Sequence, residues 1–202
     1  DIPTEIGTKI GGSMEDQQES FSDMGMLLIL ILMLVYIVMA AQFESLRYPF
    51  IIMFSIPFAF VGFILSLFIT GETINLMSLI GAIMLVGIVV KNGIVLVDYI
   101  NLNRERGMGI SQAVILGGKS RLRPVLMTSM TTILGMVPMS LGIGEGSELW
   151  QPMGIAIVGG LTVSTLVTLV IIPTVYCVFA SREVKSYRKK NLLRLNNRTV
   201  KA

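Results

Sequence analysis

Five long apolar runs, separated by short polar connections, constrain this chain more than any other feature. They cover approximately residues 24–41, 50–69, 75–97, 125–141 and 153–180. Each run is close to or above the ~18 residues that an α-helix needs to cross the hydrocarbon core of a bilayer. Only α-helices and closed barrels satisfy backbone polar groups in lipid, and these runs lack the in–out alternation of barrel strands. We therefore expect an all-α membrane protein with five transmembrane helices.

The composition supports a membrane protein and narrows its chemistry. Only 14% of the 202 residues are charged, whereas soluble domains contain about 25%. The chain has no histidine, which excludes histidine metal sites and imidazole catalysis. Its one cysteine, Cys177, lies in an apolar run and has no second cysteine to pair with. An intramembrane enzyme is the least favoured class, because the runs also lack a Ser/Lys motif at membrane depth and a pair of aspartates.

Polar segments flank the apolar region on both sides. Residues 1–23 are polar and glycine-containing, which is typical of the end of an extramembrane domain followed by a short amphipathic lead-in. Residues 24–180 form the membrane domain, and residues 181–202 form a basic tail. The sequence begins with Asp1 rather than Met, so we expect it to be part of a longer polypeptide.

The basic residues predict the orientation. The connections after the first and third runs and the tail hold 14 of the 16 Lys and Arg residues. By the positive-inside rule, the N-terminal segment lies outside and the tail inside. An odd number of spans is consistent with this orientation. We interpret the basic tail as a topology signal that also attracts anionic lipid, and we expect no nucleic-acid partner.

Helix-modifying residues lie within the runs. Pro57, Pro138 and Pro173 are expected to kink helices. Ala156 and Gly160 form a small-xxx-small pair that favours close helix packing. In the connection between the third and fourth runs, residues 110–117 are expected to form a short amphipathic segment along the inner membrane surface.

A lysine within the third run is the leading functional candidate. Lys91 is surrounded by Ile88, Val89, Val90, Ile94 and Val95. A lysine near the bilayer centre costs roughly 2.5–3.5 kcal/mol on insertion scales, and intramembrane charges commonly mark ion pathways. We therefore expect Lys91 to be functional.

Other polar residues are placed to accompany this lysine. Asn92 is adjacent to it and can form a hydrogen bond across helices, and Asp98 lies two turns later on roughly the same face. Arg121 and Arg123 enter the fourth helix, and Thr128 follows Arg121 by seven residues on one face. Alternative roles remain open: Asp98 can be a solvated helix end, and the Thr128 hydroxyl can bond its own helix.

An acidic partner for Lys91 is missing from the five runs. Glu44, Glu72 and Asp98 all lie near the ends of runs, and no Asp or Glu lies deep within one. We hypothesise that helices outside this chain supply the counter-charge. Lys91 would then be bound while that carboxylate is ionised and released when a proton neutralises it.

Three stretches resemble a known family. They are AAQFESLRYPFIIMFSIPFAFVG, VGIVVKNGIVLVDY and SRLRPVLMTSMTTILGMVPMSLGIGEGSE. They resemble the second membrane half of the resistance–nodulation–division (RND) multidrug efflux permeases. The resemblance implies half of a twelve-helix bundle, with residues 1–23 ending a periplasmic domain. It also implies a homotrimer in the bacterial inner membrane, with a periplasmic N-terminal segment and a cytoplasmic tail.

The resemblance also implies roles for individual residues. Lys91 matches the lysine of a proton relay, Thr128 its threonine and Arg121 the arginine at the cytoplasmic end of the proton path. Asn92 matches the asparagine beside the lysine, and Asp98 and Arg123 would be charges at the cytoplasmic end. Their partners would be paired aspartates in the absent N-terminal half, with protons as the coupling ion and no cofactor.

The predicted function is proton-driven efflux of drugs or amphiphiles, as antiport rather than catalysis. The implied partners are a periplasmic adaptor and an outer-membrane channel. Heavy-metal export and protein or lipid export are less favoured branches of the same superfamily. A five-helix scaffold or a truncated permease product without transport of its own is the alternative from another class.

Overall fold

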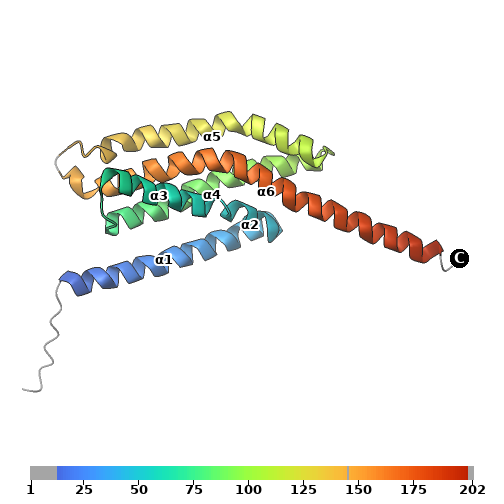
Figure 1. Ribbon diagram of the computed structural model, residues 1–202, viewed down its shortest axis with the longest axis horizontal. Helices are drawn as coiled ribbons and strands as arrows, with labels where there is room; N and C mark the ends of the chain where they lie inside the picture. Colours follow the sequence, from blue (N-terminus) through green and yellow to red (C-terminus); the bar gives the residue numbers. More distant parts are fainter. Residues whose placement is uncertain (1–12, 145, 200–202) are drawn as a thin grey trace, which may run out of the picture.

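The computed structural model is a bundle of long helices (Figure 1). It describes residues 13–144 and 146–199, with side chains for residues 17–144 and 146–180. The helices are α1 (Ser13–Gln42), α2 (Arg47–Met53), α3 (Ile56–Thr70), α4 (Leu76–Glu105), α5 (Ile110–Ser140) and α6 (Gln151–Thr199), with a 3-10 turn, η1, at Ser147–Leu149. No strand occurs among these residues, so the predicted all-α class is confirmed.

Four helical segments are long and apolar enough to cross a membrane. Within the described part of the chain they are Gln17–Gln42, Arg47–Thr70, Leu76–Glu105 and Gln151–Ala180. The remaining predicted span, the fourth run at residues 125–141, corresponds to α5, which is equally long but more polar because its middle contains three basic residues, Lys119, Arg121 and Arg123. Five helical passes therefore lie along the bundle, and the least apolar of them carries three of the six candidate residues, Arg121, Arg123 and Thr128.

Two expected boundaries are corrected by the structure. The segment at residues 110–117 is not a separate surface helix, because it forms the first turns of α5. Gly117 of this segment packs against Ile100 of α4, which holds these turns to the bundle. The third predicted helix does not end at residue 97 but continues to Glu105. Residues 1–12 and 200–202 of the predicted flanking segments lie outside the described residues.

Proline and side-chain capping explain two of the helix boundaries. The apolar run at residues 50–69 is divided into α2 and α3 just before Pro57, which occupies the first turn of α3 where its missing N–H is tolerated. At the start of α4, Asn75 and Ser78 form a reciprocal capping box, each side chain accepting from the other residue's backbone N–H at 2.9 Å. Pro124 and Pro138 within α5 and Pro173 within α6 do not end their helices.

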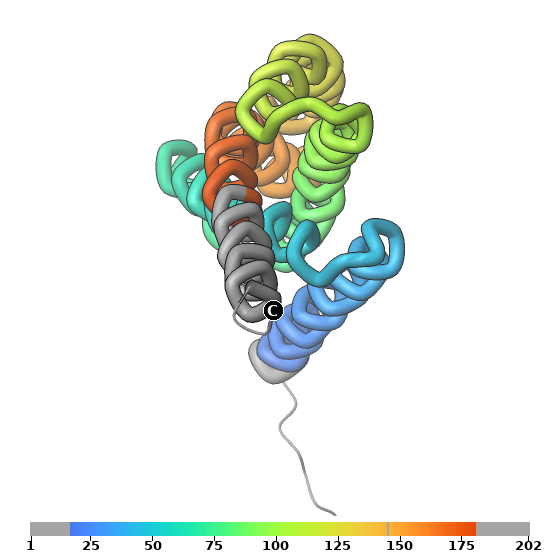
Figure 2. The backbone as a smooth tube through the Cα atoms, turned by 90° about the vertical axis from the view of Figure 1, so that its right-hand side faces the viewer, coloured from blue at the N-terminus to red at the C-terminus, as the bar shows by residue number. Residues whose placement is uncertain are grey.

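Helix α6 lies at the centre of the bundle, against α3, α4 and α5 (Figures 1 and 2). Small residues allow this close approach. A Cβ added to Gly159 would collide with Ser66 of α3, and one added to Gly160 would collide with Leu85 of α4. The predicted small-residue contact face of this helix is therefore confirmed. It allows the backbone of α6 to pack closely against α3 and α4.

Helix α1 lies at the edge of the bundle, against α2 and α4. Only 6% of its apolar window is buried within the chain. Its exposed residues are large and apolar, including Ile29, Met33 and Ile37. Because such a surface is unfavourable in water, it faces lipid or further helices.

Replacing Gly159 with alanine tests the close packing of α3 on α6. We expect G159A to lower the free energy of unfolding by about 1–3 kcal/mol, because overpacking a tight contact displaces the neighbouring helix. The matched control is G135A, since Gly135 lies in α5 with no neighbouring atom within 4 Å of an added Cβ. Unfolding of the purified chain in detergent, followed by circular dichroism, measures both. Equal stability of the two variants would contradict this packing.

Candidate functional site: a polar stripe on helices α4 and α5

Lys91 lies halfway along α4, on a face that the rest of the chain does not cover. The exposed residues of this face recur at helical spacing: Met84, Gly87, Lys91, Asp98 and Leu102. We call this stripe the open face of α4. In the end-on view of Figure 2, α5 lies above α4 and α1 lies below it, while α6 and α3 lie to its left.

An apolar groove runs along the open face between α1 and α4. Its volume is about 330 Å³, and nine residues line it: Leu34, Val35, Val38, Met39, Gly87, Val90, Lys91, Ile94 and Val95. Lys91 is the only charged group in this lining. Among the described residues, no carboxylate forms an ion pair with it. The ammonium therefore lies at an apolar surface without a counter-charge from this part of the chain.

A buried hydrogen-bond bridge lies next to Lys91. The Asn92 side-chain amide donates to Ser129 Oγ at 3.2 Å, and Thr165 Oγ1 donates to the same oxygen at 3.0 Å. All three side chains are buried. They belong to α4, α5 and α6, so one hydroxyl group joins three helices. We call this group the three-helix bridge.

The bridge fixes the register of α4 against α5. These helices are antiparallel and are joined by the tight turn at Gly107, whose φ of 85° requires glycine. Asn92 faces Ser129, and Tyr99 lies opposite Arg121, so the two helices stay aligned over two turns. Thr128 precedes Ser129 just as Lys91 precedes Asn92. In an antiparallel pair, residues that precede two facing residues project to the same side of the pair.

Lys91 and Thr128 therefore lie at the same level and on the same side of the α4–α5 pair, and both are exposed. Asp98 and Arg121 are each two turns away on that side. The structure thus places four of the six candidate residues in one line along the α4–α5 pair. We call these four residues, Lys91, Thr128, Asp98 and Arg121, the polar stripe. Arg123 is also exposed on α5, whereas Asn92 is turned inward to the three-helix bridge.

The described side chains of the polar stripe form no hydrogen bonds with one another. The Thr128 hydroxyl donates to the backbone carbonyl of Val125, one turn earlier in its own helix, at 3.0 Å. The Arg121 guanidinium lies over the ring of Tyr99, with 4.5 Å between Cζ and the ring centroid, and its buried Nε has no hydrogen-bond partner in the described part of the chain. Both groups can still bond to another partner, since a hydroxyl also accepts hydrogen bonds and a guanidinium has five N–H donors.

Sequence reasoning did not identify Ser129 and Thr165. One signal was present: Ser164, Thr165 and Thr168 recur at the spacing of one helix face within an apolar run, and all three are buried. This pattern indicates a polar inner face of α6. It does not reveal which helix that face meets, which only the three-dimensional register shows.

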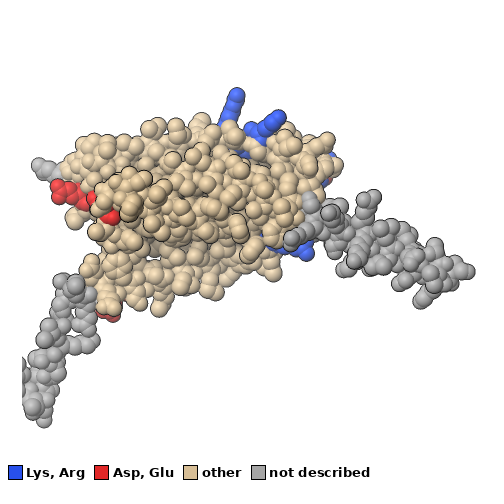
Figure 3. Space-filling model, viewed as in Figure 1, with Lys and Arg blue, Asp and Glu red and all other residues tan. Residues whose placement is uncertain are grey.

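Charge is distributed unevenly along the bundle. On the face shown in Figure 3, basic side chains gather where α4 ends and α5 begins, and acidic side chains gather at the opposite end. This separation agrees with the sequence distribution of Lys and Arg. Together with the four apolar spans, it defines a multi-pass membrane protein with one basic end.

Comparison with known proteins gives the family. The model of the AcrB/AcrD/AcrF family matches residues 1–180, so this chain belongs to that family of RND permeases. The "Swarming motility protein SwrC" of Bacillus subtilis (strain 168) is 39% identical over 191 residues, which are 94% of this chain and 18% of that protein.

Two crystal structures of a heavy metal efflux pump have a similar fold. Crystal form II has a TM-score of 0.77 and 33% sequence identity, over 85% of this chain and 17% of the pump. Crystal form I has a TM-score of 0.75 and 31% identity, over 86% of this chain and 18% of the pump. The chain therefore spans less than a fifth of the length of these relatives.

Replacing Ser129 with alanine tests the three-helix bridge. S129A removes the acceptor of two buried hydrogen bonds, so we expect the free energy of unfolding to fall by about 1–2 kcal/mol. The matched control is S120A, because Ser120 is exposed on the same helix. Unfolding of the purified chain in detergent compares the two. If S129A were as stable as S120A, the bridge would not hold the helices in register.

Proposed function

We propose that this chain is the lysine-bearing part of a proton-driven efflux permease. The observation that carries the proposal is the position of Lys91, halfway along a membrane-spanning helix and without a carboxylate partner among the described residues. An ammonium in that position is costly in lipid. Its open face, bordered by α1 and α5, leaves room for a further helix that carries an acid.

The coupling step follows from simple electrostatics. While the carboxylate on the further helix is ionised, it attracts Lys91 strongly in a medium of low dielectric constant. When the carboxylate takes up a proton, the attraction disappears and Lys91 is released. A proton gradient can then drive alternation between the two arrangements, because each arrangement binds the proton differently.

The polar stripe gives the remaining residues their proposed roles. Thr128 lies at the level of Lys91, where its hydroxyl can accept a hydrogen bond from the released ammonium. Arg121, Asp98 and Arg123 lie toward the basic end, where a proton would enter or leave. Asn92 acts indirectly, because its bond to Ser129 sets the position of its neighbour Lys91.

The proposed assembly extends beyond this chain. The paired aspartates would come from the N-terminal half of a permease, and the complete protein would form a homotrimer with a periplasmic adaptor and an outer-membrane channel. The basic end would lie in the cytoplasm and the N-terminal segment in the periplasm, with the bundle in the inner membrane.

Drugs or amphiphiles are the proposed substrates, on the resemblance of the motifs to multidrug permeases. Heavy-metal export is the second candidate, because both solved relatives are described as a heavy metal efflux pump. The relay residues are compatible with either substrate. Growth of cells expressing the complete permease in amphiphilic drugs and in Cu⁺ or Ag⁺ salts separates the two classes.

Replacing Lys91 tests the proposed relay. In proteoliposomes of the complete permease under an imposed proton gradient, we expect K91A to reduce substrate transport to the level of protein-free liposomes, because the acid loses its counter-charge. The control is K119A, which removes an exposed lysine at the basic end of α5. Full transport by K91A would exclude the relay.

The chain alone is expected not to pump. In liposomes that contain only residues 1–202, addition of substrate should cause no proton flux, because the acidic partner is absent. Co-reconstitution with the N-terminal half should restore the flux. Substrate-dependent proton flux from the chain alone would instead show that the coupling acid lies within it. Flux that stays absent in both preparations while the complete permease transports would favour the scaffold alternative.

A further inference from the structure

Ser129 differs from the other hydroxyl residues in the second half of its helix. Four Ser and Thr side chains there donate to a backbone carbonyl of the preceding turn at 2.8–3.0 Å: Thr128 to Val125, Thr131 to Met127, Thr132 to Thr128 and Ser140 to Val137. This is the usual bond of a helical hydroxyl. Ser129 Oγ instead accepts from Asn92 of α4 and Thr165 of α6. Its partners on the two neighbouring helices therefore orient this hydroxyl.

Thr165 is the corresponding exception on α6. Three other hydroxyl residues in the described part of this helix donate to their own backbone: Thr162 to Val158, Ser164 to Leu161 and Thr174 to Val170. Thr165 Oγ1 donates to Ser129 Oγ at 3.0 Å, and both residues are buried. No bulk water competes for such groups inside a membrane bundle. The bond therefore ties α6 to the acceptor of Asn92.

The apolar packing beside Asn92 leaves the rotation of α4 about its axis adjustable. The next residue is Gly93, and a Cβ added there would lie 2.8 Å from Ile52 Cγ2 of α2 and 3.1 Å from Ile172 Cδ1 of α6. The helices approach closely at this point, but a glycine has no side chain to interlock with its neighbours. Because hydrogen bonds are directional, the bond from Asn92 to Ser129 sets which way this part of α4 faces.

Lys91 follows the orientation of Asn92. Successive residues of an α-helix project about 100° apart, so a rotation of α4 that moves the Asn92 amide also moves the ammonium. With Asn92 turned inward to Ser129, Lys91 projects from the open face of α4. If Asn92 lost its acceptor, the direction of Lys91 would be free to vary.

We propose that Thr165 is a positioning residue for Lys91. By donating to Ser129, Thr165 keeps that hydroxyl turned away from its own backbone and available to Asn92. Asn92 in turn holds Lys91 toward the incoming acid, so Thr165 acts through two other side chains. The inference rests on the proposed proton relay and extends it to α6, a helix that carries none of the relay residues.

The chain offers a matched control one turn away. Thr168 is also a buried threonine of α6, but its Oγ1 has no hydrogen-bond partner in the described part of the chain. Valine differs from threonine by a methyl group in place of the hydroxyl. T165V removes the bond to Ser129, whereas T168V removes a hydroxyl that bonds to no described group. T165S keeps the donor and is the rescue variant.

The environment of Lys91 is measured first, on the purified chain in detergent. Reductive methylation with isotope-labelled formaldehyde labels the lysine amines, and K91R identifies the Lys91 signal by its loss from the NMR spectrum. We expect T165V to shift or broaden this signal, because the ammonium would sample more than one direction. T168V and T165S should leave it in place. If T165V does not fold, as judged by circular dichroism, T165A and T168A provide the same comparison. A Lys91 signal that is unchanged in the Thr165 variant would overturn the proposal.

Transport by the complete permease in proteoliposomes separates this proposal from the relay itself. We expect T165V to lower the transport rate about fivefold, the effect of one hydrogen bond on an equilibrium, while T168V and T165S transport like the original protein. If K91A abolishes transport but T165V transports as well as T168V, the relay stands and the role of Thr165 is wrong. Equal losses in T165V and T165S would also contradict it. Full transport by K91A would overturn the relay, and with it the coupling role of Thr165.

Discussion

A positive charge held halfway along an apolar helix is the constraint on which this structure depends. Hydrocarbon does not solvate an ammonium group, so the region around Lys91 must either supply an anion or remain accessible to one. The chain keeps the site accessible. The open face of α4 is bordered by α1 and α5 but not covered, and the groove beside it is lined otherwise by uncharged residues. The packing of the other helices is compatible with this requirement, because α3 and α6 bind the opposite side of α4.

Two kinds of contact hold α4 in the position that leaves its open face exposed. Glycines at the centre of α6 bring it close to α3 and α4, so dispersion contacts hold these helices without polar groups. On α5, a single hydroxyl, Ser129 Oγ, accepts hydrogen bonds from α4 and α6. Because hydrogen bonds are directional, the hydroxyl fixes the register that dispersion alone leaves adjustable. Lys91 and Thr128 are brought to one level by this register.

The sequence predicts the helices well because lipid imposes a simple rule on length and polarity. The division of the run at Pro57 and the close packing at Gly160 also follow from local chemistry. The start of α5 was not predicted, because residues 110–117 are polar enough to resemble a surface segment and only packing of Gly117 on Ile100 joins them to the bundle. Ser129 was missed for a related reason: its partners lie 37 and 36 residues away in the sequence.

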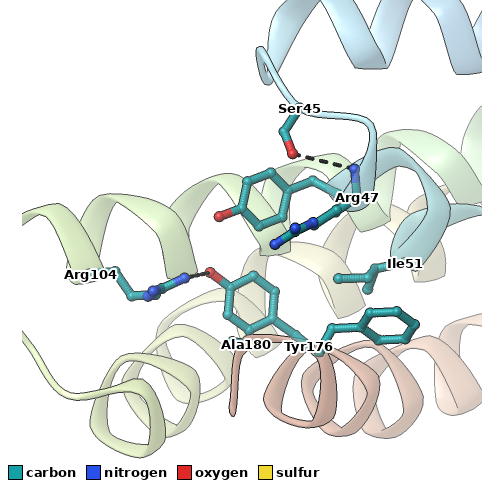
Figure 4. Close-up of a pocket in the computed structure, with 8 residues that line it drawn as sticks. Ser45, Arg47, Ile51, Arg104, Tyr176 and Ala180 are labelled. Atoms are coloured by element: carbon teal, nitrogen blue, oxygen red, sulfur yellow. Dashed lines mark hydrogen bonds between the residues drawn. The ribbon is translucent and has the colours of Figure 1, made fainter. Parts of the chain in front are cut away.

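A contact at the basic end of the bundle illustrates the same limit. Arg47, Arg104 and Tyr176 come from three distant parts of the chain, and in the sequence the two arginines count only as topology signals. Their convergence is visible only in three dimensions (Figure 4). The polar stripe was easier to anticipate, since each helix contributes residues at seven-residue spacing and short connections make neighbouring helices antiparallel.

The central claim is that an acid from outside this chain meets Lys91 at the open face. A cryo-electron microscopy structure of the complete permease at a pH where carboxylates are ionised tests it most directly. The account predicts a carboxylate oxygen of another helix within about 4 Å of Lys91 Nζ, the distance of an ion pair. An open face filled by lipid, or by a helix that presents only apolar side chains to Lys91, would contradict it.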